Sequence, residues 1–227
     1  MLKSTVVSVK ELTAPQIDIM YSIMETYYAN TTCESFIAAL KEKQDAVLLL
    51  DENAKICGFT TLAIFHFDEN TQLLYSGDTI VEQEFWGRHN LSFAWIENAL
   101  KHAEGFSGTT YWFLLSKGYK TYKYLHTFFN KYYPCVDTKT SPKIQRIMDT
   151  FAQQQYGDKY VNGVWKAGND YLKGEYDSTS DAANRDKNTA FFLKNNPGYA
   201  SGDELICLCE INISNLNKFG RRVLGIC

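Results

Sequence analysis

The sequence between residues 81 and 91 has the residue types and the position of an anion-binding loop. A predicted strand is separated there from a predicted amphipathic helix by Val81-Glu-Gln-Glu-Phe-Trp-Gly-Arg-His-Asn-Leu91. A helix N-terminus presents unpaired backbone N–H groups and a partial positive charge. A glycine just before the helix lets the backbone approach an anion closely. The order strand, Gly87, helix therefore indicates a phosphate site.

A second group of candidates lies in the preceding strand, residues 74–81. Gly77 inside a strand indicates a bulge or a close backbone approach, or else relief of packing against a helix. Asp78 is a carboxylate within an otherwise apolar strand. Burial would raise its pKa towards the range useful for a general base; alternatively, it is a structural carboxylate with a buried partner. The two-residue period of a strand predicts that Asp78 points opposite to Gly77 and Thr79.

No metal site is predicted. Cys207 and Cys209 lie in an alternating strand, where two buried thiols are the simpler interpretation than a metal pair. The four histidines show no ligand spacing, and the sequence contains neither a Gly-x-Ser-x-Gly elbow nor a P-loop.

The charge is unevenly distributed along the chain. The formal net charge is −3, which gives no general case for nucleic acid as a partner. Residues 1–116 carry 7 basic and 15 acidic side chains, whereas residues 117–146 carry 7 basic side chains and 1 acidic side chain. The local excess of positive charge would suit a phosphorylated small molecule, or it is a solvated helix face.

The remaining composition indicates a cytoplasmic protein. The 227 residues are 45% hydrophobic, enough for a large core, and contain six scattered cysteines that suit reduced thiols better than disulfides. No apolar run reaches the roughly 18 residues that a membrane span needs. The first residues alternate instead of forming the apolar block of a signal peptide.

The elements that must position these residues follow a mixed α/β order. Strands are expected over residues 5–12, 46–50, 56–67, 73–81, 110–115 and 204–213. Helices are expected after the cap at Thr13 to Gln16, from about Thr32, and over residues 90–104, 119–132 and 141–155. Residues 156–188 are predicted to be an insertion or a long loop, and Phe191 and Phe192 to precede a turn.

The order of these elements and the loop sequence resemble the GNAT superfamily of N-acyltransferases. In that family a strand ends in a sequence of the type Val-x-Pro-Glu-Tyr-Arg-Gly-Lys-Gly. The matching positions here are Val81, Glu84, Phe85, Gly87 and Arg88. Trp86 replaces the arginine, His89 replaces a second small residue, and Leu91 replaces a further one.

The resemblance implies a fold and a division of the chain. The expected fold class is α/β: a GNAT-like mixed, mostly antiparallel central sheet flanked by helices, with a C-terminal extension. Residues 1–134 would form the GNAT-like core. Residues 135–227 would be a C-terminal part of the same domain, with the insertion and a late strand.

The resemblance also implies an activity: transfer of an acyl group from acyl-CoA to a small-molecule amine by direct attack on the thioester, without a metal. The residues expected to bind the coenzyme are Val81, Trp86, Gly87, Arg88, His89, Asn90 and Leu91. Asp78, near the point where the family's fourth strand parts from the fifth, is expected to be the general base. For the acid, the family uses a tyrosine on the next helix; Tyr124 and His126 are the candidates, and the choice between them is open.

Two alternatives belong to the same resemblance. Acyl carrier protein would be the donor in an enzyme like the N-acyl amino acid synthases. A chain that has lost the cofactor would be a catalytically inactive GNAT-fold binding module, which the altered residues at 86, 89 and 91 favour.

Overall fold

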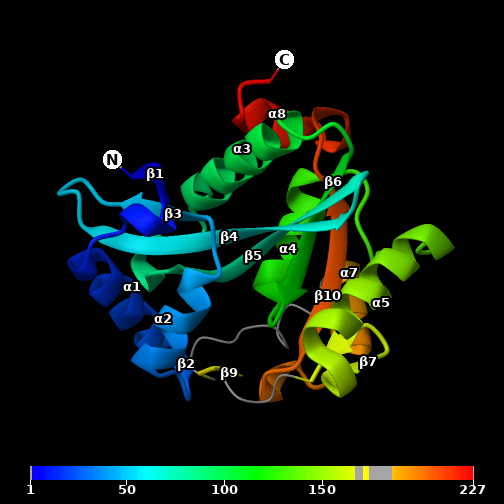
Figure 1. Cartoon of the computed structure of the whole chain (residues 1–227), viewed down its shortest axis with the longest axis horizontal. Coiled ribbons are helices and arrows are strands. Elements are labelled where there is room, and N and C mark those ends of the chain that lie inside the picture. The colour runs from blue at the N-terminus through cyan, green and yellow to red at the C-terminus, as the bar shows by residue number, and fades with distance from the viewer. Residues whose placement is uncertain (1, 167–170, 174–185, 227) are drawn as a thin grey trace.

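One mixed β-sheet organises the chain (Figure 1). The computed structural model describes residues 2–166, 171–173 and 186–226. The eight strands lie in the order β1-β3-β4-β5-β6-β10-β8-β7. Their bounds are β1 Lys3–Ser8, β3 Asp45–Leu50, β4 Ile56–Asp68, β5 Thr71–Val81, β6 Thr109–Ser116, β10 Glu204–Glu210, β8 Val164–Trp165 and β7 Tyr160–Val161. All neighbours are antiparallel except β5 and β6, which are parallel, so the predicted mixed, mostly antiparallel sheet is confirmed.

The helices begin where the sequence provides caps. They are α1 Ala14–Tyr27, α2 Cys33–Lys41, α3 Asn90–Glu104, α4 Tyr119–Phe128, α5 Pro142–Tyr156, α7 Lys187–Asn195 and α8 Lys218–Val223. Before α1, the Thr13 amide donates to Gln16 Oε1 at 2.9 Å. Before α2, Thr32 Oγ1 accepts from the Ser35 amide at 3.2 Å. Such bonds satisfy N–H groups that the first helical turn leaves unpaired.

No helix in the described part of the chain has the length and apolar character needed to cross a bilayer.

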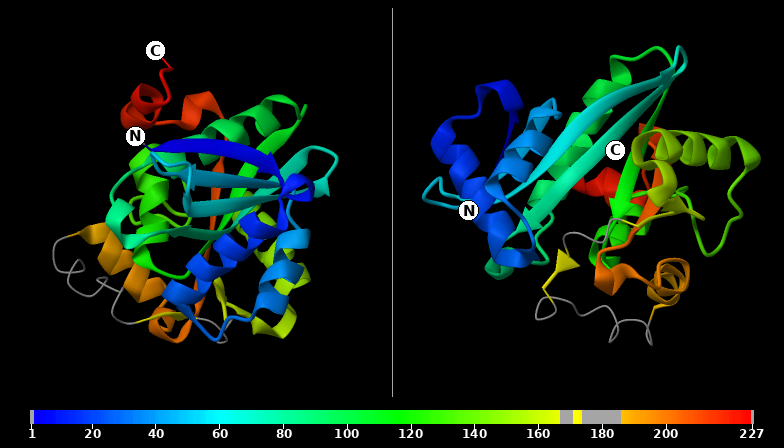
Figure 2. Two further views of the ribbon diagram at one scale, coloured as in Figure 1. Left: turned by 90° about the vertical axis from the view of Figure 1, so that its left-hand side faces the viewer. Right: turned by 60° about the horizontal axis from the view of Figure 1, so that its bottom comes forward.

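The helices cover the two faces of the sheet in different ways. On one face, α3, α4, α7 and α8 pack over the sheet in a single core that includes Trp95, Trp112 and Phe128. On the opposite face, α1 and α2 pack against β3 and β4, whereas α5 packs against β6 and β10. These two groups lie at opposite ends of the sheet (Figures 1 and 2). The middle of that face, over β5 and β6, lies between them.

Strands β5 and β6 pair over only part of their length. Their parallel register runs from Thr71 opposite Thr109 to Ser76 opposite Leu114. Strand β5 then continues to Val81, paired with β4 alone. Within the described residues, the edge of β5 that faces β6 therefore has no strand partner beyond Ser76. A strand edge of this kind leaves backbone groups available to other partners.

The later part of the chain differs from the sequence prediction in its details. Helix α4 ends at Phe128 because the following residues are extended and pair elsewhere: Phe129 bridges to Leu216 and Tyr133 to Leu208. Phe191 and Phe192 precede a turn at Pro197 and Gly198, as predicted, but they themselves lie inside a helix, α7. Strand β1 ends earlier than predicted, at Ser8, and β10 ends at Glu210. Helix α8 has no counterpart in the prediction.

The predicted loop over residues 156–188 contains short strands. The β7–β8 hairpin adds to the edge of the main sheet beside β10. A separate pair joins β2, Tyr28–Ala29, to β9, Tyr171–Leu172. Beside that pair, Lys173 Nζ donates to the carbonyl of Glu25 at the end of α1 at 3.0 Å. The rest of the predicted loop, residues 167–170 and 174–185, lies outside the described residues.

Asp45, at the start of β3, contacts two side chains of α3. Its Oδ2 accepts from Asn98 Nδ2 at 2.8 Å and lies 2.8 Å from His102 Nε2. The contact with His102 lowers the pKa of the Asp45 carboxyl, with a smaller contribution from Asn98, while burial opposes the shift. A pKa that is lower in the folded than in the unfolded chain stabilises the fold above the unfolded value, near pH 4, and the stabilisation is lost as the pH falls through the folded-state pKa.

We expect Asp45→Asn to lower the free energy of unfolding by about 1–3 kcal/mol at neutral pH, because two partners of a half-buried carboxylate lose its charge. The difference from the wild type should shrink as the pH falls below about 4 and through the lower folded-state pKa, where the wild-type carboxyl becomes protonated in the folded chain as well. Urea unfolding at several pH values measures this. Asp18→Asn, at an exposed position of α1, is the control. An equal loss at pH 3 and pH 7 would contradict the assignment.

Candidate functional site

A β-bulge at Asp78 marks the point where β5 leaves β6. Phe59 of β4 pairs with Ile80 and Thr61 pairs with Gly77, so Thr60 alone faces both Asp78 and Thr79. Asp78 has a φ of +44°, in the left-handed region that aspartate and asparagine tolerate better than most residues. The bulge expected from Gly77 is present, but its left-handed residue is Asp78.

The bulge changes which way the side chains point. Simple alternation predicted that Asp78 would point opposite to Gly77 and Thr79. Instead Gly77 and Asp78 both lie on the Lys43 side of a cleft of about 790 Å³, because an extra residue in one strand breaks the two-residue period. Thr79 also lines this cleft, and its hydroxyl lies 2.7 Å from Thr60 Oγ1. We call this space the bulge cleft. It lies over β5 and β6 and is also lined by residues of α1 and α2.

Lys43 stands over the bulge on the α2 side. Its Nζ lies 4.4 Å from the centroid of the Tyr75 ring. A Cβ added to Gly77 would come within 3.2 Å of Lys43 Cε, so the absence of a side chain at Gly77 makes room for the lysine. Burial lowers the pKa of Lys43, and the nearby charges of Asp78 and Glu42 oppose that shift.

A second pair of charges lies on the β6 side of the bulge cleft. Lys117 Nζ lies 3.5 Å from Glu204 Oε1, and both side chains are largely buried. The same ammonium group lies 5.2 Å from the centroid of the Tyr28 ring. Glu204 is the first residue of β10. The late strand therefore supplies a carboxylate to the cleft.

The predicted anion loop lines an adjoining cavity of about 330 Å³, which we call the loop cavity. Val81, Trp86, Gly87, Arg88 and His89 line it from the loop. Helix α4 lines the other side, with side chains that include Lys120, Lys123 and Tyr124. The loop cavity and the bulge cleft share four lining residues, Tyr28, Thr79, Lys117 and Thr121. The two spaces therefore meet at Thr79, just past the bulge.

The conformation of the loop depends on Gly87 and Trp86. Gly87 has a φ of +81°, and no atom lies within 4 Å of the position of an added Cβ. Trp86 Nε1 donates to the Val81 carbonyl at 2.8 Å, which folds the indole back onto the end of β5. Lys120 Nζ lies 3.7 Å from the centroid of that indole ring. The indole therefore holds the Lys120 ammonium in the cavity that Gly87 also lines.

The first turn of α3 receives no hydrogen bond from the side chain of its cap residue, His89. The His89 ring packs 5.8 Å from Phe93 and 5.9 Å from Phe128, between centroids. Burial lowers the pKa of His89, and the charge of Lys123 adds to the effect. Of the remaining predicted loop residues, Leu91 is buried in the core and Asn90 does not line the loop cavity.

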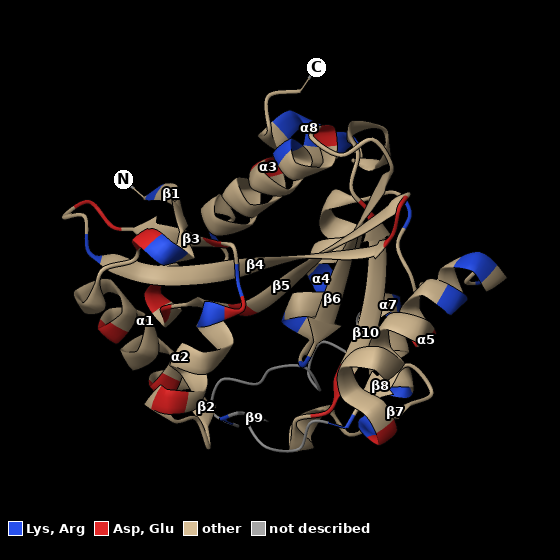
Figure 3. Cartoon of the chain, in the orientation of Figure 1, with Lys and Arg blue, Asp and Glu red and all other residues tan. Residues whose placement is uncertain are grey.

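The basic residues of the 117–146 segment do not act together. Lys117, Lys120 and Lys123 line the loop cavity. Lys143 and Arg146 lie on α5, which is at the right-hand end of the molecule in Figure 3. The predicted positive patch is therefore limited to the three lysines on α4 and just before it, because α4 and α5 pack on different faces of the sheet.

A much smaller cavity, of about 20 Å³, lies below the junction of the two spaces. Thr79 and Tyr124 line it together with Ser76 and two tryptophans. Its floor is fixed by Trp112, whose Nε1 donates to Ser76 Oγ at 2.7 Å and whose ring lies 4.4 Å from that of Trp95. We call it the tryptophan pocket. The aromatic side chains thus fill the core there and leave no long tunnel between the residues described.

The structure separates the two candidates for a general acid. Tyr124 lines both the loop cavity and the tryptophan pocket. Burial raises the pKa of Tyr124, and a hydrogen bond with Ser92 opposes that shift. His126, two residues further, points to another side of α4, because successive helix residues are 100° apart. It lies 6.4 Å from the ring of Tyr122 and lines neither cavity, so it is not brought together with Asp78.

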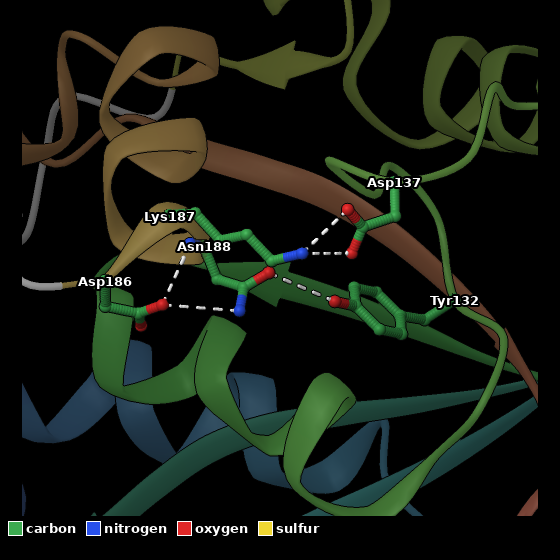
Figure 4. A network of polar contacts seen from close by, with 5 residues as sticks. All are labelled: Tyr132, Asp137, Asp186, Lys187 and Asn188. Carbon is green, nitrogen blue, oxygen red and sulfur yellow. Dashed lines mark hydrogen bonds and ion pairs between the residues drawn. The ribbon is translucent and has the colours of Figure 1, made fainter.

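His126 belongs instead to the region where α7 packs on α4. Burial lowers its pKa and the charge of Asp186 opposes the shift. Asp186 caps α7 by accepting from the Asn188 amide at 3.0 Å (Figure 4). Tyr132 donates to Asn188 at 3.4 Å, and Lys187 pairs with Asp137 at 2.7 Å. These contacts hold the helices together at a distance from the bulge.

The sequence analysis missed Lys43, Thr79 and Glu204. Thr79 could have been recognised, because it follows Asp78 in the same strand. Lys43 and Glu204 gave no local signal: Lys43 lies in the turn between α2 and β3, Glu204 begins β10, and only the fold brings both to the bulge cleft.

In the described part of the chain, no group of three or more His, Cys, Asp or Glu side chains is arranged to hold a metal ion. The cysteines described are free. Burial raises the pKa of the Cys207 thiol to about 12 and holds that of Cys209 well above its usual value, as expected for thiols in a core strand.

No protein-family model and no curated protein sequence matches the chain. Among solved structures it is similar to a probable N-acyltransferase of Enterococcus faecalis V583, with 12% identity and a TM-score of 0.41 over 54% of this chain and 31% of that one. It is also similar to a GNAT family N-acetyltransferase of Escherichia coli in complex with CoA, with 10% identity and a TM-score of 0.40 over 56% of this chain and 69% of that one. An aminoglycoside acetyltransferase from an uncultured soil metagenomic sample, in complex with sisomicin, matches with 18% identity and a TM-score of 0.39 over 54% and 82% of the two chains.

We expect the backbone at the bulge to distinguish two substitutions that remove the same charge. Asp78→Asn should be more stable than Asp78→Ala by about 1 kcal/mol, because asparagine adopts a positive φ at lower cost than alanine. Urea unfolding of the two variants at one pH gives the difference. Equal stabilities would show that the left-handed conformation at Asp78 imposes no constraint.

Proposed function

We propose that this chain transfers a short acyl group from acyl-CoA to the amine of a small molecule. The observation that carries the proposal is the parting of β5 from β6 at Ser76, which leaves two adjoining spaces of different character on either side of Thr79. One has a glycine loop, a helix N-terminus and lysines, features that suit an anionic coenzyme. The other has paired charges and polar side chains, features that suit a small acceptor.

The loop cavity has the groups that a pyrophosphate needs. Gly87 leaves open space above the loop, and the first turn of α3 keeps its N–H groups free of a side-chain cap. Lys120 and Lys123 add positive charge from the opposite wall. A helix N-terminus with nearby cations is a recurrent phosphate site. Past Ser76, the open edge of β5 would offer backbone groups to the extended arm of the coenzyme.

The reaction is a direct displacement. The amine nitrogen bonds to the thioester carbon, the carbon–sulfur bond breaks, and the products are an amide and the coenzyme thiol. The attacking amine must lose a proton, and Asp78 would receive it directly or through a water. The departing sulfur must gain a proton, and Tyr124, with its raised pKa, remains protonated at neutral pH and can supply it.

The tryptophan pocket limits the acyl group. A space of about 20 Å³ holds roughly one water-sized group, so it would accept the methyl of an acetyl group and little more. Trp95, Trp112 and Phe128 close it on the core side. The proposal therefore favours acetyl over longer acyl chains.

We expect Gly87→Glu to weaken CoA binding by at least about tenfold, or about 1.4 kcal/mol, in isothermal titration, because the substitution brings bulk and negative charge to the anion site. Gly163→Glu is a matched control: Gly163 has a φ of +83°, no atom lies within 4 Å of an added Cβ, and it does not line the loop cavity. The backbone cost is then the same in both variants. Equal CoA affinity in both would contradict the proposed coenzyme site, and no binding of CoA by the wild type would favour acyl carrier protein or an inactive binding module.

The acyl preference can be measured independently of the acceptor residues. Acetyl-CoA should exceed butyryl-CoA in kcat/KM by at least about 10-fold, since butyryl carries two more methylenes and each costs about 1–3 kcal/mol in a closed pocket. Release of the coenzyme thiol gives both rates with one amine. Ile96→Ala, which enlarges the tryptophan pocket, should reduce the difference; Ile147→Ala, buried under α5, is the control for a core cavity elsewhere. A wild type that prefers long acyl chains would contradict the assignment of this pocket.

The base can be tested with the variant that keeps the bulge. Asp78→Asn should retain CoA affinity and lower kcat by about 10²–10⁴-fold, the usual contribution of a general base. Rates at rising pH should recover part of the loss, because more of the amine is then already neutral. A variant with unchanged kcat per folded molecule would assign Asp78 to the architecture of the bulge alone.

A further inference from the structure

The charged side chains of the bulge cleft form a balanced set. Among the described residues, those that line it are Lys43, Asp78, Lys117 and Glu204, two cations and two anions. Lys117 and Glu204 form an ion pair, and Asp78 acts on Lys43 strongly enough to oppose the effect of its burial on the pKa. The cleft therefore presents both signs of charge within one space, with no net charge of its own.

The two lysines occupy different places relative to the point of reaction. Lys117 lines both the bulge cleft and the loop cavity, so it stands at their junction. Lys43 lines the bulge cleft alone and stands over Tyr75 on the α2 side. An amine that is acylated beside Thr79 would therefore have the rest of its molecule near Lys43.

The balance of charge argues against two classes of acceptor. A polyamine would gain little from a cleft in which two lysines offset two carboxylates. A purely apolar amine would bury these charges without supplying new partners, and desolvation of charged groups is costly. A molecule that carries an amine and an anionic group would compensate both signs, with its amine towards Asp78 and its anion towards Lys43.

We propose that the acceptor carries an anionic group, a carboxylate or a phosphate, close to the amine that is acylated, and that Lys43 determines this specificity. The inference rests on the proposed acyl transfer and adds the class of acceptor. Amino acids and amino phosphates have this chemistry, and the test distinguishes between them. A partly buried ammonium that is short of solvent gains most from an anionic partner, which favours Lys43 over Lys41, the exposed lysine at the end of α2.

The experiment compares matched acceptors with acetyl-CoA, by release of the coenzyme thiol. The carboxylate arm sets a mixture of α-amino acids against the corresponding amides, and the phosphate arm sets phosphoethanolamine against ethanolamine. In at least one arm the anionic acceptor should have a kcat/KM about tenfold or more above that of its neutral counterpart, equivalent to about 1.4 kcal/mol. Lys43→Gln should bring the ratio in that arm close to one, mainly through KM, and Lys43→Arg should restore part of it.

Lys41→Gln is the matched control, because Lys41 lies two residues away, is exposed and does not line the cleft. It should leave the ratio unchanged. Melting curves for the variants separate loss of folding from loss of preference, and the wild-type ratios remain decisive if Lys43→Gln does not fold. If neutral or polycationic amines were acylated at rates equal to or above those of the anionic acceptors, this inference would be overturned and the proposed acyl transfer would stand. Loss of transfer to every acceptor would overturn the proposed function, and the inference with it.

Discussion

The parting of β5 from β6 is the constraint on which the candidate site depends. The two strands are parallel, and parallel neighbours need a crossover connection, which here is α3. The crossover places the N-terminus of α3 directly after the end of β5, so the loop with Gly87 must lie at the same end of the sheet as the open strand edge. Ser76 marks the last paired position, and the hydrogen bond from Trp112 to its hydroxyl ties both strands together there. Beyond Ser76, β5 contains the bulge at Asp78 and pairs with β4 alone.

The unequal covering of the sheet explains why a cleft lies over that parting. One face is covered continuously by α3, α4, α7 and α8, which fix the tryptophan pocket and the core below it. The other face is covered by α1 and α2 at one end and by α5 at the other, with separate apolar cores. The strands between these cores keep polar and charged side chains, and the bulge brings Asp78 and Thr79 into that interval.

The sequence predicted what depends on neighbouring residues and not what depends on pairing at a distance. The cap at Thr13, the start of α2 near Thr32 and the limits of α3 follow from local patterns, and the structure agrees with them. The end of α4 does not, because Phe129 pairs with Leu216, and helix periodicity cannot report such a partner. The predicted alternation between Gly77 and Asp78 fails for a similar reason: alternation holds only while two strands keep register, and the register shift is a property of β4 and β5 together.

The C-terminal part of the chain is a component of the site and not an appendage. Strand β10 pairs with β6 along its length, from Leu205 opposite Ser116 to Glu210 opposite Tyr111. This pairing carries Glu204 to Lys117, and a largely buried lysine requires a partner of opposite charge to remain charged there. Without β10, the ammonium group at the junction of the two spaces would lose its pairing with Glu204. The bulge cleft would then lose one of its two carboxylates, and with it the balance of charge on which the proposed recognition of the acceptor depends.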